Sequence, residues 1–218
     1  TTLFMNGYNK DKKEFTLNML ASGYIETRKY EPMLIFSLEN VYRNCSYDDF
    51  RSMYERSFFD STLDSKLTAI KWKSAKDFFS ETPNDTTKKK IVFINADWCN
   101  SCKVMKRTSF SEDSVYTYLS KKFEFVDFNP ESMDTLFYNG KKFTNPKNQS
   151  APFHSLAFEL AHGGFSFPTA FIMDEKRNVI DGIPFYLTPG LLNDILHYYG
   201  ENINKVKSWQ DFMAGRHK

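Results

Sequence analysis

The stretch ADWCNSCK, residues 96–103, decides the fold because it joins two predicted elements of different type. Residues 91–94 (IVFI) precede it as a short apolar run of β-branched and aromatic residues, which is typical of a buried strand. Residues 104–107 follow it and continue as a helix. Cys99 would therefore lie at a helix N-terminus, where free backbone N–H groups and the macrodipole favour the thiolate, the nucleophilic form of cysteine.

The spacing of Cys99 and Cys102 is compatible with three kinds of site. A structural zinc site normally needs four ligands, but the remaining cysteine, Cys45, lies far upstream and the four histidines form no pair at ligand spacing. An inert structural disulfide is the second alternative. The position at a strand-to-helix junction favours the third, a redox-active dithiol that needs neither metal nor cofactor.

The composition of the 218-residue chain leaves room for one large domain, or for one domain and an extension. Aromatic residues make up 17% of it, and we expect most of them in the core. The formal net charge is +2 with both signs interspersed, so charge gives no argument for nucleic-acid binding. No apolar run approaches the roughly 18 residues of a membrane span. Residues 1–10 do not resemble a signal peptide and begin without Met, so a leader that was cleaved and a leader that was left out both remain open.

Residues 1–65 show no strand-like alternation and predict a helical extension of three short helices. The first spans residues 14–20. The second begins with Pro32 as its first helical residue, and the third is capped by Ser46. Cys45 falls between the last two, and we interpret it as a small buried hydrophobe or a spare thiol.

Residues 66–218 predict a second unit in which strands and helices alternate. The predicted elements are, in chain order, a strand at 67–72, a helix capped by Ser74, the strand at 91–94, the helix after Cys102, a helix capped near 111–113, strands at 123–128, 170–173 and 179–186, and a helix from Pro189. This order indicates an α/β fold with one mixed sheet. Pro184 places the last strand at an edge, because proline cannot donate to the ladder.

Residues 131–150 interrupt this alternation as a long insertion with two turn signals, Asn139-Gly140 and Asn145-Pro146. Long loops often carry function, so contact with a substrate or partner is one interpretation and plain surface elaboration is the other. His154 belongs to the predicted helix that follows. It has no ligand partner close in sequence, which favours a packing or surface role over metal binding.

Two motifs resemble those of the thioredoxin fold: Trp-Cys-x-x-Cys-Lys at 98–103, after a buried strand, and Phe-Pro-Thr at 167–169, before the next core strand. The resemblance covers about 66–199 and leaves the N-terminal helices without a counterpart. More narrowly, the chain resembles exported bacterial thioredoxin-like proteins related to the C-terminal domain of the disulfide reductase DsbD. This implies a central mixed sheet flanked by helices, and a periplasmic or otherwise extracytoplasmic location.

The resemblance also implies a substrate site. The Phe167–Pro168 bond would be cis and lie beside the dithiol, so that the backbone of Phe167 is free to pair with an extended substrate segment. Trp98 would shield the site and offer an apolar contact, or would serve packing alone. The Cys99 thiolate would attack a substrate disulfide, and Cys102, the more buried of the two, would then resolve the mixed disulfide.

Two positions depart from the thioredoxin pattern. Phe93 stands where thioredoxins have a buried Asp, six residues before the first cysteine. Phe123 stands where they have a buried Lys, if Asp127 is the Asp that follows that Lys. Either another group, such as Asp97 or a water, deprotonates Cys102, or exchange is slower and more specialised. Because no charge is predicted near the pair, these residues alone do not decide whether the pair is a reductant or an oxidant.

We interpret the chain as a thiol–disulfide oxidoreductase that exchanges disulfides with protein substrates through Cys99 and Cys102, used as a reductant. Its expected partners are protein thiols and disulfides, and a membrane electron donor is a further candidate. The alternatives are a thioredoxin-fold binding module with little turnover, and an isomerase or holdase that uses the helical extension as a dimerisation arm.

Overall fold

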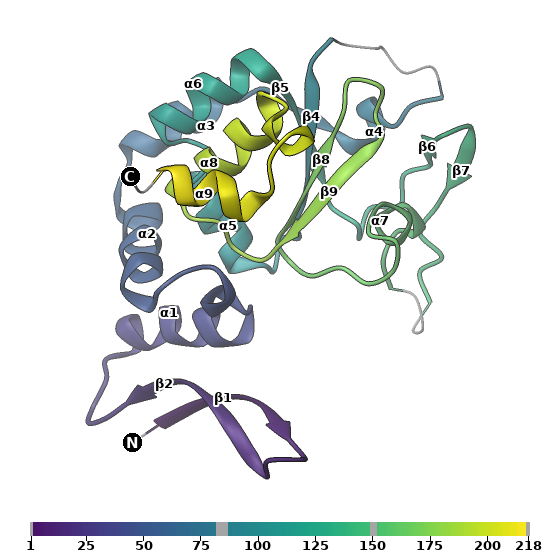
Figure 1. Ribbon diagram of the computed structural model, residues 1–218. Coiled ribbons are helices and arrows are strands. Elements are labelled where there is room, and N and C mark those ends of the chain that lie inside the picture. The colour runs from purple at the N-terminus through teal and green to yellow at the C-terminus, as the bar shows by residue number, and fades with distance from the viewer. Residues whose placement is uncertain (1, 82–86, 149–151, 217–218) are drawn as a thin grey trace.

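The computed structural model describes residues 2–81, 87–148 and 152–216, and its central feature is a five-stranded mixed sheet flanked by helices (Figure 1). The strand order is β3-β5-β4-β8-β9. The strands are β3 Trp72–Ser74, β4 Lys89–Ile94, β5 Phe123–Phe128, β8 Thr169–Met173 and β9 Val179–Pro184. Strands β3, β5 and β4 run parallel, and β8 and β9 add antiparallel. The predicted α/β fold with one mixed sheet is confirmed.

Strand β4 lies at the centre of the sheet, and all six of its residues are buried. Residues 91–94 are apolar, whereas the amino groups of Lys89 and Lys90 donate to Glu175, at its side chain and at its carbonyl respectively. Successive side chains of a strand face opposite sides of the sheet. Ile91 and Phe93 pack with residues of α5, α6 and α8, whereas Val92 and Ile94 pack with residues of α4 and α7. These helices are α4 Ala75–Phe78, α5 Asn100–Arg107, α6 Asp113–Lys122, α7 Ser155–Leu160 and α8 Pro189–Gly200.

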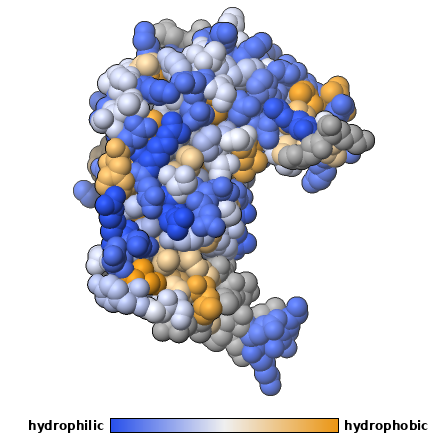
Figure 2. Space-filling view, turned by 90° about the vertical axis from the view of Figure 1, so that its left-hand side faces the viewer, coloured by the Kyte–Doolittle hydropathy of each residue, from blue (hydrophilic) through white to orange (hydrophobic). Residues whose placement is uncertain are grey.

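The N-terminal region begins with a β-hairpin, β1 Thr2–Asn9 and β2 Glu14–Ala21, which lies apart from the sheet (Figure 1). The prediction of a helix at 14–20 is wrong. Phe15, Leu17 and Met19 alternate with polar residues, and in so short a segment this period of two is hard to separate from a helical one. Leu20 and Tyr24 are exposed, and Figure 2 shows apolar surface at this end of the molecule.

Helices follow the hairpin, so the prediction of a helical N-terminal region is confirmed for this part of the chain. They are α1 Thr27–Leu38, α2 Tyr47–Phe59 and α3 Thr62–Ala69, with a short 3₁₀ turn, η1 Val41–Arg43, after α1. Pro32 lies inside α1 and not at its start. Burial of Ile35 and Phe36 on the same helix offsets the hydrogen bond that proline cannot donate. Ser46 caps α2 as predicted, since its Oγ accepts the N–H of Asp49 at 3.2 Å.

The strand predicted at 67–72 is wrong for most of its length. Helix α3 continues to Ala69, and only Trp72–Ser74 pair with β5. Leu63, which is fully buried, lies one helical turn before Leu67 and anchors α3 on the body. The expected domain boundary between residues 65 and 66 therefore falls inside a helix.

The insertion forms a second hairpin, β6 Leu136–Tyr138 and β7 Lys141–Phe143. Asn139 (φ 50°) and Gly140 (φ 72°) form its tip, as the Asn-Gly signal predicts. Residues 149 and 150 of the insertion lie outside the described residues. At the C-terminus, η2 Ile203–Lys205 leads into α9 Trp209–Arg216. The ring of Trp209 lies 5.2 Å from that of Tyr198, so the tail is docked on α8.

Candidate redox site

The Cys99–Cys102 pair lies where β4 passes into α5 and forms a disulfide with an S–S distance of 2.03 Å. Strand β4 ends at Ile94, and the N–H of Asn95 still donates to the carbonyl of Phe128 at 3.1 Å. Cys99 is the N-cap residue of α5, and its Sγ accepts the N–H of Cys102 at 3.2 Å. The strand thus delivers Cys99 to the end of a helix, where backbone donors point at its sulfur.

Both cysteines are shielded from solvent, since Cys99 is 0% and Cys102 is 1% exposed. The two cysteines are thus equally buried in the disulfide, and the expected difference between them is not seen in this state. The N-terminal region packs on this part of the molecule, because Ile35, Phe36 and Val41 belong to the same apolar cluster as the two cysteines and Glu39 lies 3.6 Å from Cys99 Sγ. Thiol–disulfide exchange requires contact between two sulfurs. A substrate sulfur can reach Cys99 only if part of the protein that covers it moves.

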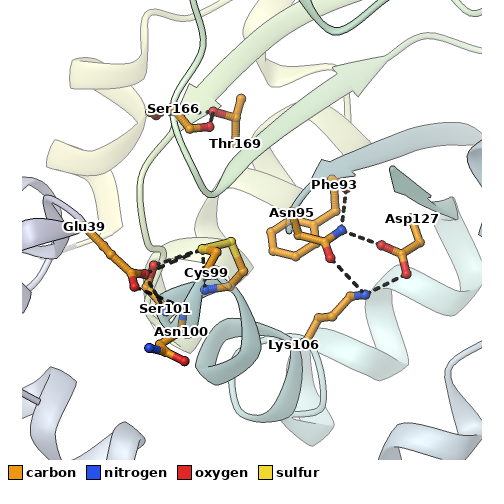
Figure 3. Close-up of a disulfide and its surroundings, with 11 residues drawn as sticks. Glu39, Phe93, Asn95, Cys99, Asn100, Ser101, Lys106, Asp127, Ser166 and Thr169 are labelled. Atoms are coloured by element: carbon orange, nitrogen blue, oxygen red, sulfur yellow. Dashed lines mark hydrogen bonds and ion pairs between the residues drawn. A yellow bond between two sulfur atoms is a disulfide. The ribbon is translucent and has the colours of Figure 1, made fainter. Parts of the chain in front are cut away.

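Glu39 brings a carboxylate to the disulfide (Figure 3), although no motif in the sequence marks it. It follows the last residue of α1, and it accepts the N–H of Asn100 at 3.1 Å and the N–H of Ser101 at 2.7 Å. Its Oε2 also lies 3.6 Å from Cys99 Sγ. A disulfide sulfur carries no proton, so this last approach is a contact and not a hydrogen bond. The expectation that no charge lies near the pair is wrong.

Trp98 and Phe167, two of the predicted substrate-binding residues, lie together, with ring centroids 4.8 Å apart. Trp98 is 52% exposed, and its Nε1–H donates to Glu131 of the insertion at 3.1 Å. The Phe167–Pro168 peptide bond is cis, and Pro168 is buried. The residue before Cys99 thus presents an exposed indole that is held by two contacts.

A polar network lies in the last turn of α5 (Figure 3). Lys106 Nζ forms an ion pair with Asp127 Oδ2 at 2.7 Å. The other oxygen of Asp127 accepts from Asn95 Nδ2, which also donates to the carbonyl of Phe93 at 3.2 Å. Lysine thereby neutralises the carboxylate of Asp127, and the network links α5 to β5.

The two positions that depart from the thioredoxin pattern have apolar surroundings. Phe93 is 0% exposed, and its ring lies 5.1 Å from that of Phe110 and 6.0 Å from that of Trp72. Phe123 is also buried, at the start of β5. Asp97 is exposed, and its role as a proton acceptor stays a prediction.

Cys45 lies between η1 and α2, half-buried and outside the disulfide. Burial, with the nearby Asp49 carboxylate, raises the pKa of its thiol to about 12. Its Sγ donates to the carbonyl of Ser46 at 3.2 Å. A thiol that stays protonated near neutral pH is a poor nucleophile. Sulfur chemistry in this chain therefore falls to Cys99 and Cys102.

Comparison with known proteins gives one family. A family model described as a thioredoxin-like domain matches residues 81–200. Among solved structures, the chain is similar to a thioredoxin-fold protein from Helicobacter pylori, with 14% identity and a TM-score of 0.46 over 74% of this chain and 92% of that one. It is also similar to the oxidised C-terminal domain of DsbD from Neisseria meningitidis, with 16% identity and a TM-score of 0.34 over 65% and 93%. No curated protein matches the chain by sequence. Within the described ranges, no helix combines the length and apolar character needed to cross a membrane.

Proposed function

The chain belongs to the thioredoxin-like family, and on that premise we propose that it is a thiol–disulfide oxidoreductase acting through Cys99 and Cys102. The observation that carries this proposal is the position of the disulfide at the N-terminus of α5, with Cys99 Sγ accepting the N–H of Cys102. The same donor and the positive end of the helix dipole would favour the thiolate that forms when the S–S bond is cleaved.

In the reducing direction, the Cys99 thiolate attacks one sulfur of a protein disulfide and releases the other as a thiolate. Cys102, once deprotonated, attacks the Cys99 sulfur of the mixed disulfide, forms the intramolecular disulfide and releases the second substrate sulfur. The substrate gains two electrons and two protons, and the Cys99–Cys102 dithiol loses the same two electrons and two protons. A dithiol donor must then reduce the pair again, and a membrane electron donor is the candidate for this step.

We assign substrate contact to Trp98, Phe167 and Pro168. The exposure of the Trp98 indole and its packing on Phe167 support this assignment, because a fixed apolar surface next to Cys99 suits an unfolded or extended protein segment. The expected substrates are protein disulfides, which persist mainly outside the cytoplasm. An extracytoplasmic location, with an N-terminal extension that packs on the thioredoxin-like unit, is part of the same proposal.

A second candidate function is a thioredoxin-fold binding module with little turnover. One observation favours it: Cys99 is 0% exposed, so the nucleophile of the first proposal is covered in the disulfide state. An isomerase or holdase that uses the N-terminal region as a dimerisation arm belongs to the same alternative. In these cases the disulfide would contribute to the fold of the binding surface and would not be exchanged.

The test is reduction of insulin disulfides by the reduced chain, followed as thiol release. Cys99→Ser should lower the rate to that of the uncatalysed reaction, because the attacking sulfur is gone. Cys102→Ser should accumulate a mixed disulfide between Cys99 and insulin, visible on a non-reducing gel. Cys45→Ser is the matched control and should match the wild type. A wild-type chain no faster than Cys99→Ser would contradict the oxidoreductase and favour the binding module.

A further inference from the structure

Glu39 occupies the place where a reactive thiolate would find its stabilising donors. The first turn of α5 offers the N–H groups of Asn100, Ser101 and Cys102, of which Glu39 accepts the first two and Cys99 Sγ the third. A carboxylate is stable there because a helix N-terminus carries a partial positive charge. The donors that would favour a Cys99 thiolate are thus shared with a second anion.

The charge of Glu39 has no cation to balance it. Across residues 2–81, 87–148 and 152–216 its polar contacts are the two backbone N–H groups and Cys99 Sγ, and no ion pair involves it. Cys99 is 0% exposed and Glu39 is half-buried, so water screens the interaction between them only in part. A like charge within about 4–6 Å disfavours the charged form of a titrating group. The carboxylate therefore opposes ionisation of the thiol that forms when the disulfide is reduced.

We propose that Glu39 is a positioning residue of the redox site, which keeps Cys99 protonated in the resting dithiol and thereby makes the pair a reductant. This inference rests on the proposed function and gives its exchange a direction. When a dithiol donor reduces the pair, the S–S bond takes up two electrons and two protons, one proton on each sulfur. The proton on Cys99 then faces Oε2 of Glu39. A pair whose thiolate is strongly stabilised is an oxidant, because its reduced form is favoured. Glu39 acts in the opposite sense.

Through Glu39, the N-terminal region would influence the ionisation of Cys99. Glu39 ends α1 and lies outside residues 81–200, the segment that the family model matches. Ile35 and Phe36, on the same helix, pack in the cluster that contains the disulfide. These contacts hold α1 against the site, so the carboxylate has a fixed position relative to the sulfur.

The test compares alkylation of Cys99 by iodoacetamide in the reduced wild type and in Glu39→Gln, over a wide pH range. Peptide mapping separates Cys99 from Cys45. Glutamine keeps a carbonyl oxygen for the N–H groups of α5 but removes the charge. We expect the midpoint of the rate profile to fall by about one pH unit, which raises the rate well below the midpoint about tenfold. Glu39→Asp, which keeps the charge, should stay close to the wild type. Glu26→Gln, an exposed change at the start of the same helix, is the matched control.

The shape of the pH profile decides between a charge effect and a loosened cover. If Glu39→Gln is faster by one constant factor at every pH, or has an unchanged midpoint, the inference is overturned. The reduction potential in glutathione buffers gives a second readout and should become less negative in Glu39→Gln, by about 30 mV for a tenfold change in the equilibrium constant. Alkylation uses no protein substrate. A chain that alkylates as expected but does not reduce insulin would contradict the proposed function and leave the role of Glu39 in place.

Discussion

The two ends of helix α5 meet acidic side chains in different ways (Figure 3). At the N-terminus, Glu39 accepts two backbone N–H groups and touches Cys99 Sγ, and in the described part of the chain it forms no ion pair. In the last turn, Lys106 pairs with Asp127 at 2.7 Å, and Asn95 donates to the other carboxylate oxygen. One carboxylate is neutralised by a cation, and the other stays charged beside a sulfur.

This difference separates stability from chemistry. A paired and partly exposed carboxylate adds modestly to stability and fixes α5 on the sheet. An unpaired carboxylate beside a redox sulfur acts on how readily that sulfur is ionised. Lys106 and Asp127 lie within the segment that the family model matches, whereas Glu39 lies outside it. The family segment therefore supplies the neutralised carboxylate, and the N-terminal region supplies the one that lies beside the disulfide.

The largest expected effect is on stability, from a substitution that places a new carboxylate next to α5. Unlike the carboxylate of Asp127, it would have no cation as a partner, and it would lie in the apolar cluster that packs against the helix. Phe93 is 0% exposed in this cluster. Phe93→Asp should lower the free energy of unfolding by about 4 kcal/mol or more, because it buries an unpaired charge and removes an aromatic ring from the core. Urea denaturation followed by tryptophan fluorescence measures this change.

Phe93→Leu is the control for the lost ring, and it should cost about 1 kcal/mol. The comparison between the two variants separates the loss of the ring from the burial of a carboxyl group. Should Phe93→Asp prove as stable as Phe93→Leu, a carboxylate would be accommodated at this position without a cation. The distinction between paired and unpaired acids around α5 would then lose its physical basis.

A smaller effect is expected from breaking the paired end of α5. Lys106→Met keeps a long unbranched side chain but removes the cation from Asp127 and from the ring of Trp72, whose centroid lies 5.3 Å from Lys106 Nζ. We expect a loss of about 1 kcal/mol in the free energy of unfolding, because the pair is partly exposed. The midpoint of Cys99 alkylation should move by only about 0.3 pH unit. Urea denaturation and the alkylation profile of the same preparation measure both quantities.

The double variant Lys106→Met/Asp127→Asn is the matched control, since it removes both charges and should recover part of the lost stability. A midpoint shift in Lys106→Met as large as that of Glu39→Gln would show that the two ends of α5 act on the cysteines as one network.

The sequence predicts those parts of the fold that depend on neighbouring residues. The run at 91–94 is buried because every residue in it is apolar, and Asn139-Gly140 forms a hairpin tip because these residues tolerate positive φ. Ser46 and Ser74 cap helices through bonds to residues three positions on. The helix predicted at 14–20 is wrong because β1 decides its conformation, and a partner strand cannot be inferred from the segment itself.

The residues of the site divide in the same way, into those that are neighbours in sequence and those brought together by packing. Cys99, Cys102 and Trp98 lie within one motif, so their proximity follows from the chain itself. Glu39 reaches Cys99 across 60 residues, and its place depends on how α1 packs. A single glutamate at the end of an amphipathic helix carries no signal of such a contact. The full burial of Cys99 cannot be inferred from the motif for the same reason, because residues of the N-terminal region share its apolar cluster.

The smallest expected effect concerns His154, which lies outside α5. Its titration should change the stability of the fold with pH, whereas Glu39→Gln tests the pH dependence of Cys99 alkylation. The Nδ1 of His154 accepts the N–H of Leu156 at 3.1 Å and caps α7, while its Nε2 pairs with the carbonyl of Asp134 at 3.0 Å. These bonds fit the neutral ring with its proton on Nε2. Burial lowers the pKa of His154 below its usual value. A proton on Nδ1 would break the cap.

The sign of the effect follows from this depressed pKa. Below the unfolded pKa of about 6.5 the unfolded chain binds the proton more readily than the folded chain, so stability falls as the pH decreases toward the folded pKa. Between about pH 7.5 and pH 6 we expect a loss of roughly 0.5 kcal/mol, measured by urea denaturation. His154→Asn keeps a capping oxygen but does not titrate, so its stability should change less over this range. The carboxylates with a lowered pKa, Asp60, Asp174 and Glu175, titrate below this pH range. If wild type and His154→Asn lose the same stability over this range, His154 is not the group that links stability to pH, and the prediction is contradicted.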